Sequence, residues 1–102
     1  MKKVTIQLTW NELLALNDTI GIVFEKCPAQ DWHDRLIQAV MIKFYARLQQ
    51  KTIIFRRQFT VSMEADIAAS FVLFFANIDI IPSSFAGNII NKIIAKIDKT
   101  FA

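Results

Sequence analysis

Twice along this chain, an alternation of apolar and polar residues passes directly into a helical spacing of apolar residues, and this repeated change most constrains the fold. Residues 4–10 alternate as a half-buried strand does, and Thr9 and Glu12 then have the spacing of a capping box. We expect a helix over residues 10–26, which Pro28 ends because the residue before a proline disfavours helix. The predicted inward residues of this helix are Leu13, Leu16, Ile20, Val23 and Phe24.

A second helix is predicted over residues 30–50, with Asp31 and Asp34 at its N-terminal end, where acidic residues are favoured. At about 100° per residue its apolar side chains fill one broad arc, as expected of a helix that faces a core. The residues of this arc are Leu36, Ile37, Val40, Met41, Phe44 and Leu48.

Strand-like alternation returns over residues 51–62. Arg57 is unusual there, because it falls on the face otherwise built from Ile53, Phe55, Phe59 and Val61. A buried arginine must be paired with an acid, whereas a bulge would turn it outward, and the sequence leaves both possibilities open. Ser62 is expected to cap a third helix that has Glu64 and Asp66 in its first turn.

The third helix is apolar on almost every side between Ile67 and Phe75, so we expect it to be buried. Residues 77–82 break the helix, and Ser83 or Ser84 starts a fourth one. The residues on the predicted inward face of the fourth helix are Phe85, Ile89, Ile90, Ile93, Ile97 and Phe101.

These elements predict an α+β fold of two strand-helix-helix units, β-α-α-β-α-α, in which a small two-stranded sheet packs against four helices. We expect the 102 residues to form one domain. A shift of 53 positions aligns similar residues, which suggests pseudo-repeats over 3–51 and 52–102. Two amphipathic helices in the same phase would give much of this match, so the duplication is a hypothesis.

Composition excludes several classes of protein. Apolar residues make up 54% of the chain, with two Gly and two Pro, which excludes a disordered linker. The longest apolar stretch, residues 67–78, is shorter than the roughly 20 residues that span a bilayer. Because residues 4–10 alternate instead of forming an apolar signal-peptide core, we expect no targeting signal and a reducing, cytoplasmic location.

Few residues offer catalytic or metal-binding chemistry. Asp31, His33 and Asp34 form the one cluster with acid–base potential, but a metal site needs more ligands, and an acidic first turn of a helix explains the cluster. Cys27 has no base in its surroundings that would make it a nucleophile. Gly21 and Gly87 fall inside predicted helices, which suggests close helix packing and not a phosphate-binding loop. We therefore predict no enzyme, no cofactor, no metal and no small-molecule substrate.

A window of basic residues suggests one possible partner. The net charge is +3, and no acidic residue occurs between Asp34 and Glu64. Cations held on one face of a protein attract phosphates, so contact with nucleic acid or another anion is an alternative function. A modest total charge and the absence of a known recognition motif weigh against it, since long basic stems often cover only the rim of a core. The candidate contact residues are Arg35, Lys43, Arg47, Lys51, Arg56 and Arg57.

Self-association is the partner interaction that the predicted architecture favours. Each strand of a two-stranded sheet has one unpaired edge, and the apolar third helix carries Phe71, Phe74 and Phe75. The opposing interpretation makes that helix the core of a monomer. We predict a homodimeric, non-enzymatic protein-interaction or accessory protein; the alternatives, in order, are a nucleic-acid-binding accessory protein, an enzyme and a membrane-surface protein.

Overall fold

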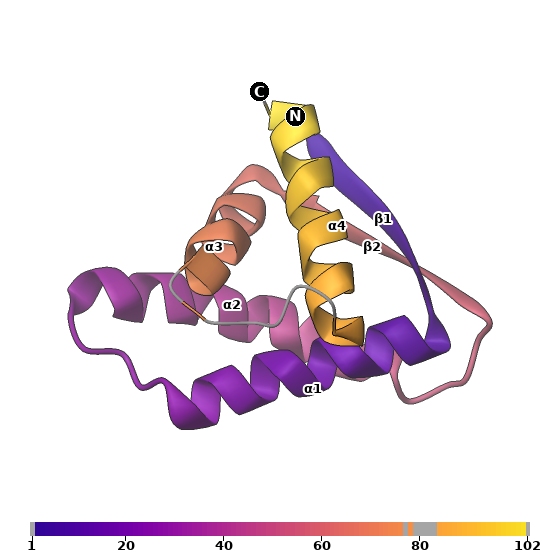
Figure 1. The fold of residues 1–102 in the computed structure, drawn as a ribbon, viewed down its shortest axis with the longest axis horizontal. Coiled ribbons are helices and arrows are strands. Elements are labelled where there is room, and N and C mark those ends of the chain that lie inside the picture. The colour runs from indigo at the N-terminus through magenta and orange to yellow at the C-terminus, as the bar shows by residue number, and fades with distance from the viewer. Residues whose placement is uncertain (1, 77, 79–83, 102) are drawn as a thin grey trace.

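The elements of the fold follow the predicted order (Figure 1). The computed structural model describes residues 2–76, 78 and 84–101. The α+β class and the order β-α-α-β-α-α are confirmed. The elements and their bounds are β1 (Lys3–Thr9), α1 (Trp10–Lys26), α2 (Trp32–Lys51), β2 (Gln58–Glu64), α3 (Ala65–Ala76) and α4 (Phe85–Phe101).

β1 and β2 form a two-stranded antiparallel sheet, with Lys3 opposite Glu64 and Thr9 opposite Gln58. Alternate residues of both strands are buried, because the helices cover one face of the sheet: α4 contacts β1, and α3 contacts β2. The polar residues between them stay exposed on the other face, as the period of two requires. The buried residues of the sheet are Val4, Ile6, Leu8, Phe59, Val61 and Met63.

The start of α1 has the predicted capping box. The backbone N–H of Thr9 donates to Oε1 of Glu12 at 2.9 Å, and the N–H of Glu12 donates to Oγ1 of Thr9 at 3.2 Å. Two N–H groups at the helix start, which have no partner inside the helix, are thereby satisfied. This box fixes the sharp change of direction between β1 and α1.

α2 begins at Trp32, two residues later than predicted, with Asp31 as its N-cap. The prediction that Leu36 faces inward is wrong, because 68% of this residue is exposed. α2 packs against α3 and α1 along a narrower stripe than the predicted arc, and Leu36 lies outside it. The buried residues of α2 are Ile37, Met41, Phe44 and Leu48.

The second strand lies later in the chain than predicted. The range 51–62 is wrong because α2 continues to Lys51 and residues 52–57 form no strand, whereas β2 spans Gln58–Glu64. Ser62 is therefore not a helix cap: it lies within β2, opposite Thr5. Arg57 precedes β2 and is exposed, so neither of the two arrangements considered for it occurs.

α3 and α4 complete the core. Aromatic rings of α3 are buried, as predicted for an apolar helix: Phe71 lies 4.9 Å from Phe75 and 6.1 Å from Phe44, measured between ring centroids. Oγ of Ser84 accepts the N–H of Gly87 at 3.0 Å, which confirms Ser84 as a residue that starts the last helix. The predicted break at residues 77–82 and the alternative start at Ser83 lie outside the described residues, except for Ile78. Phe85 is 55% exposed, contrary to the prediction, because it is the first residue of α4 and the buried positions of this helix begin at Gly87.

The remaining predicted inward residues of α4 are buried or half-buried: Ile89, Ile90, Ile93, Ile97 and Phe101. Buried residues from both predicted halves share one apolar cluster. The architecture adds no support for the internal duplication, which stays a hypothesis.

Candidate interaction surface

The connection between α2 and β2 exposes three consecutive large apolar residues. Ile53, Ile54 and Phe55 are 78%, 65% and 64% exposed. We call residues 51–57 the apolar–basic loop, because Lys51, Arg56 and Arg57, all exposed, flank these three. In Figure 1 the connection runs out to the right-hand edge of the molecule, near the point where β1 passes into α1.

Contacts at both ends hold this loop. The Oγ1 hydroxyl of Thr52 donates to the carbonyl oxygen of Gln49 at 2.6 Å, so the loop leaves the last turn of α2 in a fixed direction. Further along, the ring of Phe55 packs edge-on against Trp10, with centroids 5.2 Å apart. Trp10 in turn packs against Phe59 of the sheet at 5.8 Å. The contact of Phe55 with Trp10, and of Trp10 with Phe59, therefore holds the loop at the end of the sheet.

The structure separates the six predicted anion contacts into two groups. Arg35, Lys43 and Arg47 lie within α2, and Lys51 is both its last residue and the first of the apolar–basic loop, whereas Arg56 and Arg57 lie at the far end of that loop. Within α2 the guanidinium of Arg35 lies 4.9 Å from the ring centroid of Trp32. The six cations therefore do not belong to one element.

Acidic groups offset part of the charge on α2. Nη1 of Arg47 lies 3.2 Å from Oε2 of Glu64. Hydrogen bonds from the backbone N–H of Glu64 itself and then from Arg47 lower the pKa of this carboxyl. Lys43 and Arg47 also line a hollow with Glu64 and Asp66, so this stretch of α2 has a mixed-charge neighbourhood.

The three predicted self-association residues are in the core. Phe71, Phe74 and Phe75 are 0%, 7% and 5% exposed. The ring of Phe74 packs against Phe24 of α1 with centroids 5.2 Å apart. These rings hold the monomer together, and a second copy would have to contact other side chains of α3.

Asp31, His33 and Asp34 lie together at the start of α2, with one potential ligand atom from each within 4.8 Å of the others. The two carboxylates have structural roles there. Oδ1 of Asp31 accepts the N–H of Asp34 at 2.8 Å, and Oδ2 of Asp34 accepts the N–H of Gln30 at 3.4 Å. Helix capping accounts for this cluster.

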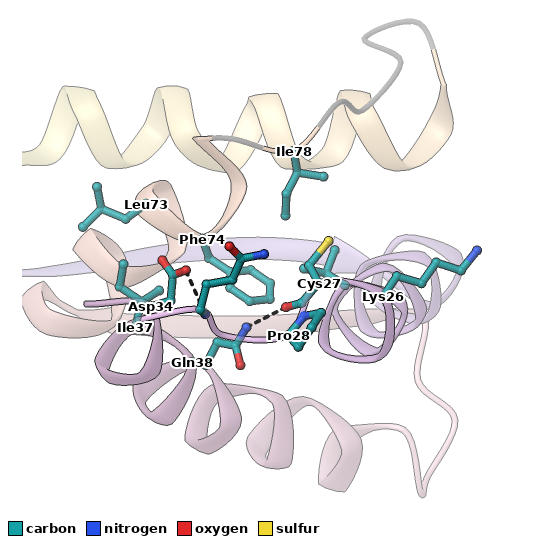
Figure 2. A pocket seen from close by; sticks show the side chains of 11 residues that line it. Lys26, Cys27, Pro28, Asp34, Ile37, Gln38, Leu73, Phe74 and Ile78 are labelled. Atoms are coloured by element: carbon teal, nitrogen blue, oxygen red, sulfur yellow. Dashed lines mark hydrogen bonds between the residues drawn. The ribbon is translucent and has the colours of Figure 1, made fainter. Parts of the chain in front are cut away.

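A hollow of about 310 Å³ lies where the C-terminal end of α1 meets α2 and the end of α3 (Figure 2). Nε2 of Gln38 donates to the carbonyl oxygen of Cys27 at 2.9 Å and thereby ties the α1–α2 connection to α2. Sequence reasoning missed this hollow, because separate segments of the chain enclose it. Its lining residues are Val23, Lys26, Cys27, Pro28, Gln30, Asp34, Ile37, Gln38, Leu73, Phe74 and Ile78.

Comparison of this chain with protein-family models, with curated proteins and with solved structures found no match. Among the described residues, no helix has both the length and the apolar character that crossing a bilayer requires.

Proposed function

We propose that this chain is a non-enzymatic interaction protein that self-associates through the outer side of α3 and the adjoining part of α2. The composition of the exposed side of α3 carries this proposal. Ala65, Ala69, Leu73 and Ala76 are exposed, and their spacing of three or four residues places them on one side of the helix. Asp66 is the one charged residue of α3; it is exposed in the first turn and lines the mixed-charge hollow with Ala65, so the purely apolar part of this side begins at Ala69. A helix side that faces water normally carries more polar residues, so this side suits a protein contact.

The neighbouring part of α2 extends this apolar surface. Leu36 is 68% exposed, and Trp32, one turn earlier on the same side of the helix, is 79% exposed. Ile37, next to Leu36, lines the same hollow as Leu73, which brings the two helices together at this point. We call this surface the α2–α3 face; it consists of Trp32, Leu36, Ala65, Ala69, Leu73 and Ala76.

A second copy of the chain would suit this face, because two apolar faces related by a twofold axis bury each other. Measuring the mass in solution by light scattering over a range of protein concentrations tests this. We expect the mass of the wild type to rise towards that of a dimer. Replacing Leu36 and Leu73 by Glu should leave a monomer at every concentration, since two unpaired charges would then have to be buried.

The matched control is Ile22→Glu on α1, because Ile22 is 50% exposed and Leu73 is 47% exposed. This control should associate as the wild type does. Circular dichroism should show the same helix content for all variants. A wild type that stays monomeric at every concentration would refute the proposal, as would unchanged association of the Leu36→Glu, Leu73→Glu variant.

Nucleic-acid contact is the alternative proposal, supported by the run of exposed cations between Asp34 and Glu64. Fluorescence polarisation with labelled duplex DNA, single-stranded DNA and RNA tests it at low and at physiological salt. Affinity should fall steeply as salt rises if the cations contact phosphates. Absence of binding at low salt would remove this alternative.

A further inference from the structure

The apolar–basic loop lies away from the α2–α3 face, and its chemistry differs. Leu36 and Lys51 are 15 residues apart on α2, which corresponds to about 22 Å along the helix axis. Ile53 and Ile54 are aliphatic and largely exposed, and Phe55 adds an aromatic ring beside them. A run of three exposed large apolar residues is unfavourable in water, so this loop suits an apolar environment.

The charge around the loop is positive. Lys51 precedes the three apolar residues, and Arg56 and Arg57 follow them; all three cations are exposed. Glu12, which accepts the backbone N–H of Thr9, lies two residues after Trp10, the ring that contacts Phe55. This carboxylate is 19% exposed and lies 3.6 Å from the ammonium of Lys92. The loop itself contains no acidic residue. Its three apolar side chains therefore lie among three cations whose charge no other residue of the loop offsets.

We propose that this loop binds the surface of an anionic lipid bilayer, with Ile53, Ile54 and Phe55 entering the boundary between headgroups and acyl chains. Lys51, Arg56 and Arg57 would then lie at the level of the lipid phosphates, where long basic side chains extend naturally. Trp10, which supports Phe55, is of a residue type enriched at this depth.

A bilayer fits these residues better than a nucleic acid does. Bases stack on aromatic rings and on guanidinium planes, but an isoleucine side chain offers neither a π face nor a hydrogen bond. Two of the three exposed apolar residues are isoleucines. An anionic membrane surface accepts both kinds of residue. Its phosphates attract the cations, and its acyl chains take the aliphatic side chains out of water.

Sedimentation with vesicles tests this inference. The purified protein is mixed with vesicles of phosphatidylcholine alone, or of phosphatidylcholine with phosphatidylserine, at low and at physiological salt. We expect binding to the anionic vesicles, weaker binding at higher salt, and little binding to the neutral vesicles. Ile53→Ser with Ile54→Ser should lower the affinity about tenfold or more. Arg56→Gln with Arg57→Gln should lower it about fivefold for each cation removed.

Two matched control variants show whether a loss of vesicle binding is specific to the loop or follows from removing any exposed cation or apolar side chain. Lys43→Gln removes one cation from α2, and Leu36→Ser removes an exposed apolar side chain from the α2–α3 face. Both should bind vesicles as the wild type does, apart from a small loss from the reduced net charge in Lys43→Gln. All variants should keep the wild-type circular dichroism and thermal midpoint, because the substituted side chains are exposed.

Two results would overturn the inference. The first is no binding to anionic vesicles at low salt. The second is binding that the isoleucine substitutions leave unchanged, because the apolar residues would then have no part in it. If, in this second case, the Ile53→Ser, Ile54→Ser variant also has a lower mass in solution than the wild type, the loop is assigned to self-association. Self-association through the α2–α3 face is measured separately with the Leu36 and Leu73 variants, so either proposal can fail alone.

Discussion

The hydroxyl oxygen of Tyr45 on α2 lies 2.8 Å from the position that a Cβ atom on Gly21 of α1 would occupy. The absence of a side chain at Gly21 therefore lets the Tyr45 ring lie across α1. The same ring packs edge-on against Phe24, with centroids 5.6 Å apart. A glycine inside a helix is explained here by the approach of a side chain from the neighbouring helix.

Gly21→Ala should stabilise the protein only when the Tyr45 hydroxyl is removed. Alanine favours a helix interior over glycine by about 1 kcal/mol, but in the wild type the new Cβ forces the tyrosine to move and weakens its contact with Phe24. In a Tyr45→Phe background the next atom, Cζ, lies at an ordinary contact distance of 3.5 Å. Urea unfolding of the four proteins measures the difference. Equal gains in both backgrounds would mean that the hydroxyl does not limit the space.

The capping box gives α1 a pH-dependent contribution to stability. The hydrogen bond from the Thr9 backbone, and to a smaller extent the charge of Lys92, lower the pKa of Glu12 from its ordinary 4.5. A lowered folded-state pKa contributes stability at pH values above the unfolded-state pKa, and this contribution is lost as the pH falls through the folded-state value. Glu12→Gln should therefore be less stable than the wild type near neutral pH, and this difference should shrink as the pH falls below the ordinary carboxyl range and through the folded-state pKa.

The measurement is the free energy of unfolding in urea as a function of pH. Lys92→Gln is the control, because it keeps the capping carboxylate and removes only a secondary cause of the shift. It should reduce the pH dependence without abolishing it. A constant difference between Glu12→Gln and the wild type across the acid range would contradict the assignment.

Substitutions of Phe71 and Phe55 compare the stability lost when a core ring is removed with the stability lost when an exposed ring is removed. Phe71 is fully buried between Phe44 and Phe75, so Phe71→Ala should destabilise the protein by about 3–5 kcal/mol. Phe55 is 64% exposed, so Phe55→Ala should cost much less, chiefly through the lost contact with Trp10. Urea unfolding in the absence of lipid measures both. A similar loss for the two variants would show that Phe55 contributes to the core.

Features that reside within a few residues could be predicted from the sequence. The capping box of Thr9 and Glu12 requires only the residues between them, and the alternation in residues 4–8 is likewise local. The second strand was misplaced because a strand also needs a partner. β1 offers seven residues, Lys3–Thr9, and these pair with Gln58–Glu64. Ile53 and Phe55 fall on the same alternating positions as Phe59 and Val61, but they have no strand opposite them.

The candidate surfaces depend on distant parts of the chain. Ile53 and Phe55 have the pattern of buried strand residues, and their exposure follows only from the position of β1. The outward position of Leu36 likewise depends on where α3 packs on α2. An apolar residue at the edge of a helix face can lie on either side of the boundary between core and surface, and the sequence of one helix does not set that boundary.

Two serines that the sequence assigned to helix starts should respond differently to substitution. Oγ of Ser84 accepts the N–H of Gly87 at 3.0 Å, so Ser84→Ala should cost about 1 kcal/mol through the loss of a cap on α4. Ser62 is exposed within β2, opposite Thr5, and Ser62→Ala should change stability by less than about 0.5 kcal/mol. Thermal and urea unfolding of the two variants test this directly. A larger loss at Ser62 than at Ser84 would indicate that α3 begins at Ser62 in solution, and the register of the sheet would then have to be shorter than seven residue pairs.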